Sequence, residues 1–231
     1  MNARAPVIAV DGPSGVGKGT LCRWLANRLG FHLLDSGALY RLTALAALRR
    51  NLALENEAEV AALAAGLAAD FLTETGGPSR ILLDGAEVGP DLRTETCGNA
   101  ASRVASLPMV RVALLQRQRD FRQLPGLIAD GRDMGTVVFP DAELKLFLTA
   151  SAEERARRRH NQLSEQGMDA NLESLVGEIA ERDARDRQRA TAPLRPAADA
   201  EVLDTTHWSI VEVCERALAL AIQRLGLPGN R

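Results

Sequence analysis

The feature that most constrains the fold is a short apolar run followed at once by a glycine-rich turn, with the sequence VIAVDGPSGVGKGT between Val7 and Thr20. The β-branched run Val7 to Val10 predicts a buried strand, and a helical pattern begins at Lys18 and continues to about Arg28. A strand, a glycine loop, a lysine and a helix in this order predict a phosphate-binding loop. Glycines let successive backbone N–H groups surround one anion, while the helix N-terminus and Lys18 supply positive charge.

The loop departs from the common pattern at one position. A Ser or Thr usually follows the lysine and binds Mg²⁺ through its hydroxyl, whereas here Gly19 stands in that place and Thr20 follows. The Gly-Lys-Gly-Thr variant resembles nucleoside monophosphate kinases rather than GTPases. The residues predicted to hold the nucleotide phosphates are Gly12, Pro13, Ser14, Gly15, Val16, Gly17, Lys18, Gly19 and Thr20.

Composition excludes several classes of protein. The chain has 231 residues, of which 46% are hydrophobic and 25% charged, and its net charge of −2 gives no general attraction to nucleic acid or membranes. No apolar run approaches the roughly 20 residues of a membrane helix, and the N-terminus leads straight into the first strand, which leaves no room for a signal peptide. The three cysteines are widely spaced and suggest no metal site. We therefore expect a cytoplasmic protein with reduced thiols and without nucleic-acid or membrane partners.

Further short apolar runs alternate with helical patterns along the chain, and this alternation predicts an α/β fold. We expect a five-stranded parallel sheet of the P-loop NTPase type, flanked by helices, with its ligands at the carboxyl ends of the strands. The predicted strands after the first lie at 31–34, 127–130, 142–149 and 201–204.

Two segments interrupt the alternation. The pattern of residues 71–88 predicts a small antiparallel meander. Residues 153–195 contain two arginine-rich helical patterns joined by a polar stretch. The second pattern usually indicates two solvent-exposed helices whose side chains form many salt bridges. A more specific alternative for some of its arginines is a mobile lid that closes over phosphates. The expected division is a core of about 5–50, 107–152 and 196–227, an insertion of about 51–106 and a lid of about 153–195.

Arginines at predicted strand ends form the second half of the expected site. Arg132 follows the strand at 127–130 and Arg41 opens the helix after the second strand, so both are candidates for binding phosphate through guanidinium forks. The alternative is that each is a surface arginine in a weak ion pair. Lys145 is expected at a solvated or edge-strand position, and His32, His160 and His207 are interpreted as structural.

Several blocks together give the chain a resemblance to bacterial-type cytidylate kinases over nearly its whole length. The most specific are the Asp-Ser-Gly block at 34–41 and the Gly-Arg-Asp-Met-Gly block at 128–136, supported by the phosphate loop, 98–102 and 182–189. The resemblance implies transfer of the ATP γ-phosphoryl to CMP or dCMP with Mg²⁺, by a protein that we expect to be a monomer.

The resemblance also implies a role for individual residues. Ser36, Tyr40, Arg41, Arg132 and Arg189 would hold the acceptor phosphate. Ser102, Arg111 and Asp133 would read the cytosine, and Arg182 and Asp186 would face the sugar. Lys18, Arg132 and Arg189 are the expected catalytic residues, and Arg158 of the lid is expected to reach ATP. Either Asp35 or Asp130 would hold the Mg²⁺ waters, and the sequence leaves both open.

Two other functions share the phosphate loop. A nucleotide switch would need an Asn-Lys-x-Asp block for guanine and an Asp-x-x-Gly switch, and neither occurs in the chain. A kinase for another small acceptor, such as shikimate or gluconate, leaves the Asp-Ser-Gly block, the meander and Asp133 without an explanation.

Overall fold

The computed structural model describes residues 4–72, 80–165, 167, 169 and 171–227. The chain divides into two compact units, one formed by Met1–Asp35 with Gln118–Arg231 and the other by Ser36–Arg117. The sequence placed the insertion at about 51–106, whereas the second unit already begins at Ser36. The predicted boundaries of the insertion and the lid, which are functional divisions, stay predictions.

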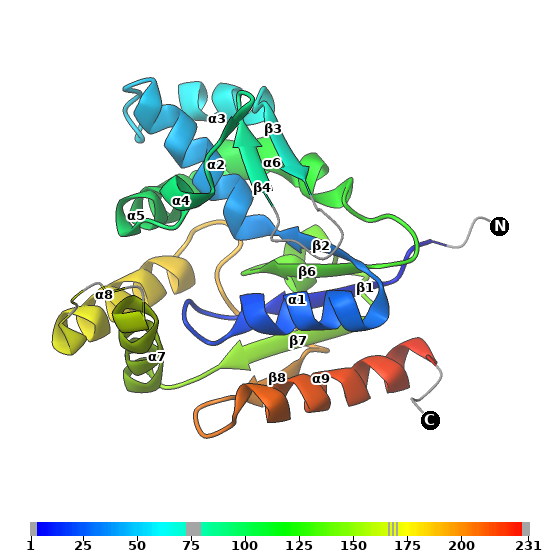
Figure 1. Ribbon diagram of the computed structural model, residues 1–231. Coiled ribbons are helices and arrows are strands. Elements are labelled where there is room, and N and C mark those ends of the chain that lie inside the picture. The colour runs from blue at the N-terminus through cyan, green and yellow to red at the C-terminus, as the bar shows by residue number, and fades with distance from the viewer. Residues whose placement is uncertain (1–3, 73–79, 166, 168, 170, 228–231) are drawn as a thin grey trace. The chain divides into compact units, whose positions relative to one another are not determined.

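The first unit is built on a parallel sheet of five strands in the order β2-β6-β1-β7-β8 (Figure 1). This confirms the predicted α/β class and the parallel sheet. β1 is central, with β6 on one side and β7 on the other, so the phosphate loop that follows it starts from the middle of the sheet. The strands are β1 (Val7–Asp11), β2 (His32–Asp35), β6 (Leu127–Gly131), β7 (Leu144–Thr149) and β8 (Glu201–Asp204).

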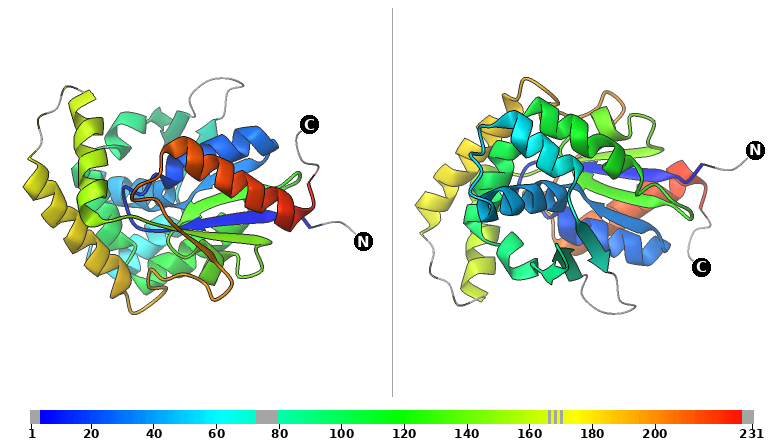
Figure 2. Two further views of the ribbon diagram at one scale, coloured as in Figure 1. Left: turned by 90° about the horizontal axis from the view of Figure 1, so that it is seen from below. Right: turned by 90° about the horizontal axis from the view of Figure 1, so that it is seen from above.

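The helices of this unit follow the predicted patterns with two differences. The first arginine-rich helix continues to Glu165, into the stretch expected as a polar connection between the two helices, and a short helix after Asp133 was not predicted. The two arginine-rich helices, α7 and α8, lie side by side in both views of Figure 2. The helices are α1 (Lys18–Leu29), η1 (Met134–Val138), α7 (Ala152–Glu165), α8 (Leu172–Arg187) and α9 (Ile210–Leu225).

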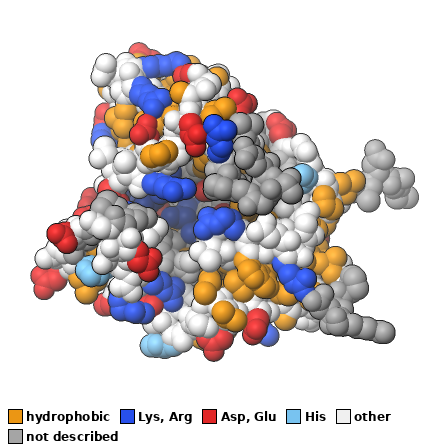
Figure 3. Space-filling model, in the orientation of Figure 1, with side chains coloured by type: hydrophobic (Ala, Val, Ile, Leu, Met, Phe, Trp, Pro, Cys, Tyr) orange, Lys and Arg blue, Asp and Glu red, His pale blue; other side chains and the backbone are white. Residues whose placement is uncertain are grey.

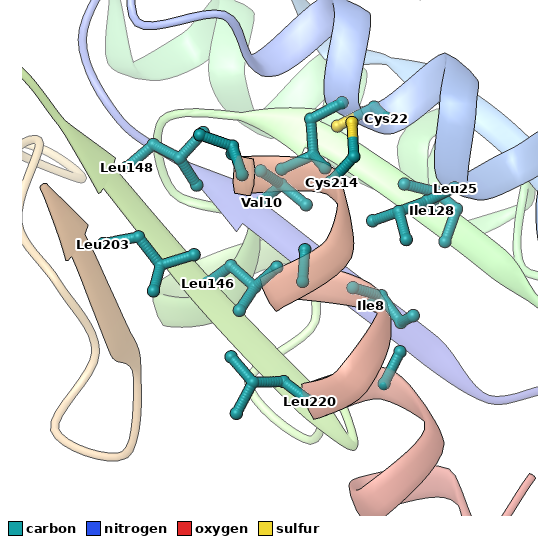
Figure 4. Close-up of a cluster of buried hydrophobic side chains, with 14 of the residues drawn as sticks. Ile8, Val10, Cys22, Leu25, Ile128, Leu146, Leu148, Leu203, Cys214 and Leu220 are labelled. Atoms are coloured by element: carbon teal, nitrogen blue, oxygen red, sulfur yellow. The ribbon is translucent and has the colours of Figure 1, made fainter. Parts of the chain in front are cut away.

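One face of the sheet is covered by α1 and α9. Alternate strand residues such as Ile8, Val10 and Leu146 point into a buried cluster that also contains Cys22 of α1 and Cys214 of α9 (Figure 4). Because side chains alternate along a strand, the odd-numbered residues of β1 face the other way, towards η1. The cluster fixes α1, and with it the helix start that follows the phosphate loop.

Lys145 lies on the η1 side of the sheet, and the prediction that it is solvated or on an edge strand is wrong. It belongs to β7, which is paired on both sides, and is 8% exposed. Its Nζ donates to Pro140 O at 2.7 Å and to Asp199 Oδ1 at 2.9 Å, while its methylene groups lie against Gly135. The methylene groups of Lys145 therefore pack within the protein, while its ammonium group is paired with oxygen atoms of Pro140 and Asp199.

The second unit combines helices with an antiparallel sheet of three strands in the order β3-β4-β5. This confirms the predicted meander, although part of the predicted range 71–88 lies outside the described residues. Helix α2 packs against α5 and α3. The elements are α2 (Ser36–Arg49), α3 (Glu57–Ala65), β3 (Ala69–Leu72), β4 (Arg80–Leu83), β5 (Ala86–Glu87), α4 (Gly89–Leu92), α5 (Glu95–Val104) and most of α6 (Pro108–Arg119).

Within the part of the chain that the structure describes, no helix is both long enough and apolar enough to cross a membrane.

Neighbouring residues of β8 test the assignment of the buried face. Leu203 is 6% exposed and belongs to the cluster, whereas Val202 is 56% exposed. We expect Leu203→Ala to lower the free energy of unfolding by about 2–4 kcal/mol because it leaves a cavity. The matched control Val202→Ala should cost about 1 kcal/mol or less. Equal losses in urea unfolding of the two variants would contradict the packing described here.

Candidate functional site

The phosphate loop is shaped by glycines that no other residue can replace without strain. Gly12 follows β1 with φ +147°, and a Cβ at this position would lie 2.3 Å from Leu148 O. Gly17 has φ +91° and is the N-cap of α1. These two positions let the chain leave the sheet, turn and enter a helix whose first N–H groups face the loop.

Lys18 is buried inside the loop that it follows. Its side chain is 6% exposed, and Nζ donates to Gly12 O at 2.8 Å and to Pro13 O at 2.9 Å. Asp130 Oδ1 at the end of β6 lies 3.9 Å from Nζ. Burial and the nearby Arg132 charge lower the pKa of Lys18 to about 8, although Asp130 opposes this change. The loop therefore holds its ammonium through its own carbonyl oxygens.

Two carboxylates lie beside the start of α1. Asp35 and Asp130 are register partners on β2 and β6, and each lies at or near the carboxyl end of its strand. Burial raises the pKa of Asp130 to about 6 despite the opposing charge of Lys18. A Cβ on Gly19 would lie 3.7 Å from Asp130 Oδ2, so this glycine brings the backbone of α1 close to the carboxylate.

These carboxylates meet the chemical preference of Mg²⁺, which binds proteins through one or two carboxylates and keeps several waters. A larger cluster is not needed for such a site, and none of three or more His, Cys, Asp or Glu occurs among the described residues. Asp35 and Asp130 therefore fit the predicted role, and the structure leaves both as candidates.

The predicted arginines of the first unit gather around one buried carboxylate. Asp186 of α8 is 1% exposed, accepts from Arg132 Nε at 2.9 Å and also accepts from Arg189 Nη2. Burial alone would raise the pKa of Asp186, but the charges of Arg132, Arg189 and Arg182 outweigh it and hold the pKa below its usual value. The structure thus brings together four residues that the sequence predicted for the acceptor.

Helix α7 is tied to the phosphate loop by two arginines that donate to loop carbonyl groups. Arg155 Nη1 donates to Ser14 O at 3.2 Å, and Arg158 Nη1 lies 3.4 Å from Val16 O. Arg158 also donates to Thr205 O at 2.6 Å. The sequence predicted Arg158 as an ATP contact, and the structure places it at the loop.

Arg155 was missed as a site residue. It forms a bidentate ion pair with Asp183 of α8, in which Nη1 donates to Oδ1 at 3.0 Å and Nη2 to Oδ2 at 2.6 Å. Both side chains are buried. The pair joins α7 to α8 while the same guanidinium contacts the loop. Nothing in the arginine-rich sequence distinguishes Arg155 from its neighbours, because its partner lies far along the chain.

Several of the remaining charges on α7 and α8 make ordinary surface pairs. Acidic and basic side chains are interspersed on the face of these helices seen in Figure 3. Arg157 pairs with Glu154 at 2.8 Å and Arg185 with Glu181 at 2.5 Å, each within one helical turn. Such pairs contribute little to stability, which agrees with the solvated interpretation for these arginines.

The second unit groups another set of predicted acceptor residues. The guanidinium of Arg111 lies 5.6 Å from the centre of the Tyr40 ring, and Arg111 donates to Ala105 O at 3.1 Å. Arg41 Nη1 donates to Leu92 O at 2.6 Å. Ser36 begins α2, and Ser102 lies on α5, which packs against α2; both serines are buried.

Two further carboxyl groups of the first unit, those of Asp133 and Asp11, are buried. Asp133 is 2% exposed and immediately precedes η1. Asp11, which was not predicted from the sequence as a site residue, accepts from the backbone N–H groups of Met134 and Gly135, each at 2.8 Å. The sequence could have indicated Asp11, since this acidic residue ends the otherwise apolar strand β1.

The buried pair Arg155–Asp183 gives a stability test. We expect Asp183→Ala to lower the free energy of unfolding by about 3–5 kcal/mol, since it leaves the Arg155 charge buried and uncompensated. The control Arg157→Ala breaks an exposed pair and should cost about 1 kcal/mol or less. In thermal or urea unfolding, the double variant Arg155→Met with Asp183→Leu should recover most of the loss. A small effect of Asp183→Ala would show that the pair is not buried in solution.

Comparison with known proteins gives a consistent assignment. The family model described as cytidylate kinase matches residues 8–223. The cytidylate kinase of Aeromonas salmonicida (strain A449) is 58% identical over 226 residues, which is 98% of each chain. That of Klebsiella pneumoniae (strain 342) is 57% identical over 227 residues, covering 98% of this chain and 100% of the relative.

Solved structures with low sequence identity show weaker likeness. TT1252 from Thermus thermophilus is 20% identical with a TM-score of 0.48, covering 98% of this chain and 100% of that one. A shikimate kinase from Bacteroides thetaiotaomicron is 15% identical with a TM-score of 0.43, covering 94% and 98%. Such low identities and TM-scores assign no family, and the family model and the sequence relatives make the assignment. Both span nearly the whole chain, and the chain therefore belongs to the cytidylate kinase family.

Proposed function

We propose that the protein transfers the γ-phosphoryl group of ATP to CMP or dCMP, giving ADP and CDP or dCDP. One observation supports this function beyond family membership. The phosphate loop and the block that contains Arg132 and Asp133 start from paired strands, with Asp11 of β1 in register with Gly131 of β6. A loop suited to phosphates and a block suited to an acceptor nucleotide thus leave the same edge of one sheet.

The donor ATP is bound by the phosphate loop, Gly12 to Thr20, with Arg158 beside it. Phosphoryl transfer depends mainly on positioning and on positive charge around the moving group. Lys18 supplies a buried ammonium, and Arg132 and Arg189 supply guanidinium groups that spread over phosphate oxygens. The acceptor needs no general base, because a phosphate monoester with a second pKa of about 6 is largely dianionic at neutral pH.

The acceptor residues divide by the part of the nucleotide that they bind. Arg182 and Asp186 bind the sugar, and Asp133 accepts from the exocyclic amine of cytosine. Uracil has a carbonyl at that position, so mispairing of the buried carboxylate costs about 1–3 kcal/mol and favours cytosine by roughly tenfold or more. The phosphate is held by Ser36, Tyr40, Arg41, Arg132 and Arg189, and the base is also read by Ser102 and Arg111.

Mg²⁺ is part of the proposal, with its waters held by Asp35 or Asp130. The ion would neutralise part of the triphosphate charge when bound. Whichever carboxylate holds them, the waters would lie next to Gly19, a position that has no hydroxyl side chain.

The oligomeric state, the location and the partners of the protein are also proposals. We infer a monomer that works in the cytoplasm on small molecules, without nucleic-acid or membrane partners. The cytidylate kinase family supports small-molecule substrates, and the net charge of −2 gives no general attraction to nucleic acid or membranes.

Steady-state assays with ATP and a panel of acceptors test the function. We expect CMP and dCMP to be phosphorylated with kcat/KM at least about tenfold above that for UMP, with AMP, shikimate and gluconate poor acceptors. Asp133→Asn should reduce the preference for CMP over UMP by about tenfold, because an amide can also donate to the uracil carbonyl. A wild-type enzyme that prefers gluconate or shikimate, or that does not favour cytosine, would refute the proposal.

The pKa of Lys18 predicts how ATP binding depends on pH. Since burial lowers that pKa to about 8, the ammonium loses its proton as the pH rises above this value. ATP affinity measured by calorimetry should therefore fall between about pH 8 and pH 9.5 in the wild type. Lys18→Met should bind ATP weakly and without this alkaline decrease. The same decrease in both proteins would show that another group causes it.

A further inference from the structure

Asp11 lies between the two parts of the first unit that the proposed function uses. It is the last residue of β1 and directly precedes Gly12 of the phosphate loop. Its side chain is 5% exposed and, because Ile8 and Val10 face the core cluster, it points to the opposite side of the sheet, towards η1. The residue is therefore attached to the donor loop by the chain and faces the acceptor block with its side chain.

Both oxygens of this carboxylate bind the acceptor block. Oδ1 accepts from Met134 N and Oδ2 from Gly135 N, each at 2.8 Å. These N–H groups belong to the first turn of η1, and the residue immediately before them is Asp133. A carboxylate that accepts from two consecutive amides fixes the orientation of two peptide planes, and so fixes the direction in which the chain leaves Asp133.

Burial of a carboxylate at this position is unfavourable for folding. Burial raises the pKa of Asp11 to about 7, although both backbone hydrogen bonds and the Lys18 charge oppose the change. The negative charge of nearby Asp133 adds to the cost. A neutral side chain would avoid this cost, so stability alone does not explain a carboxylate at this position. Groups held in unfavourable environments cluster at functional sites.

We propose that Asp11 is a positioning residue for nucleotide selection, which orients the Met134–Gly135 turn so that Asp133 meets the cytosine ring. Asp11 does not contact the substrate itself. It acts through two main-chain hydrogen bonds and links the phosphate loop to the base-reading carboxylate. This inference rests on the proposed function, since it assumes that Asp133 reads the base.

The substitution Asp11→Asn tests the proposal with little change in volume. The amide keeps one acceptor oxygen but places an NH₂ donor against a backbone N–H, so the turn loses one of its two bonds. We expect the ratio of kcat/KM for CMP to that for UMP to fall about tenfold, mainly through a higher KM for CMP, with the KM for ATP changed by less than about threefold. Amide hydrogen exchange of Met134 and Gly135 should become faster.

Val7→Ala is the matched control, because Val7 is fully buried on the same strand and lies on the same face as Asp11. It should lower stability without changing the CMP to UMP ratio. If Asp11→Asn does not fold, the ratio is measured on Asp11→Ser, a smaller neutral residue with one acceptor oxygen.

The outcomes separate this inference from the proposed function. A wild-type enzyme without cytosine preference refutes the function and with it the inference. A wild-type enzyme that prefers CMP, combined with Asp11 variants that lose activity equally for CMP and UMP or behave like the wild type, refutes the inference alone. A purely structural role predicts the equal loss.

Discussion

The burial of one positive charge, the ammonium of Lys18, is the constraint on which the rest of the site depends. An ammonium in a site with little water needs oxygen atoms around it, and the loop supplies them from its own backbone at Gly12 and Pro13. The loop can present those carbonyls only because Gly12 adopts a conformation that places its Cα against Leu148 O. The central position of β1 in the sheet then fixes where the loop lies.

The same loop is held from outside by the helices that follow β7. Arg155 and Arg158 donate to carbonyl groups of Ser14 and Val16, and Arg155 is fixed in turn by Asp183. Any movement of α7 relative to the sheet must therefore break or carry along contacts with the phosphate loop. The buried ion pair makes α7 and α8 move together, because separating its partners leaves a charge without compensation. The pair thus connects the arginine-rich helices to the phosphate loop.

Sequence patterns predicted the features of the fold that depend on local residues. Val7 to Val10, the glycine loop and the helix from Lys18 are encoded by neighbouring residues, and α9 likewise begins at a local capping pair, Ser209 and Glu212. The alternation of apolar runs and helices predicted the parallel sheet because few topologies satisfy it.

Features that depend on distant residues were not predictable in this way. The turn η1 follows a glycine-containing block and owes its first two hydrogen bonds to Asp11, more than 120 residues earlier. Lys145 has no local signal for burial, since its partners come from a loop and from Asp199. For the candidate site, the sequence blocks at 128–136 and 182–189 predicted the arginines that surround Asp186. Arg155 and Asp11 were identified only from their contacts in the structure. Whether the second set of residues, from Ser36 to Arg111, binds the acceptor remains a prediction from the family resemblance.

We propose that one edge of the sheet holds the donor phosphates beside a carboxylate that selects the acceptor base. A crystal structure with CMP and a non-hydrolysable ATP analogue would show this arrangement. We expect the terminal phosphates of the analogue within hydrogen-bond distance of Lys18 Nζ and the cytosine amine on the Asp133 carboxylate, with Asp11 still bound to Met134 and Gly135. Cytosine held by other residues, or a triphosphate bound away from Lys18, would contradict it.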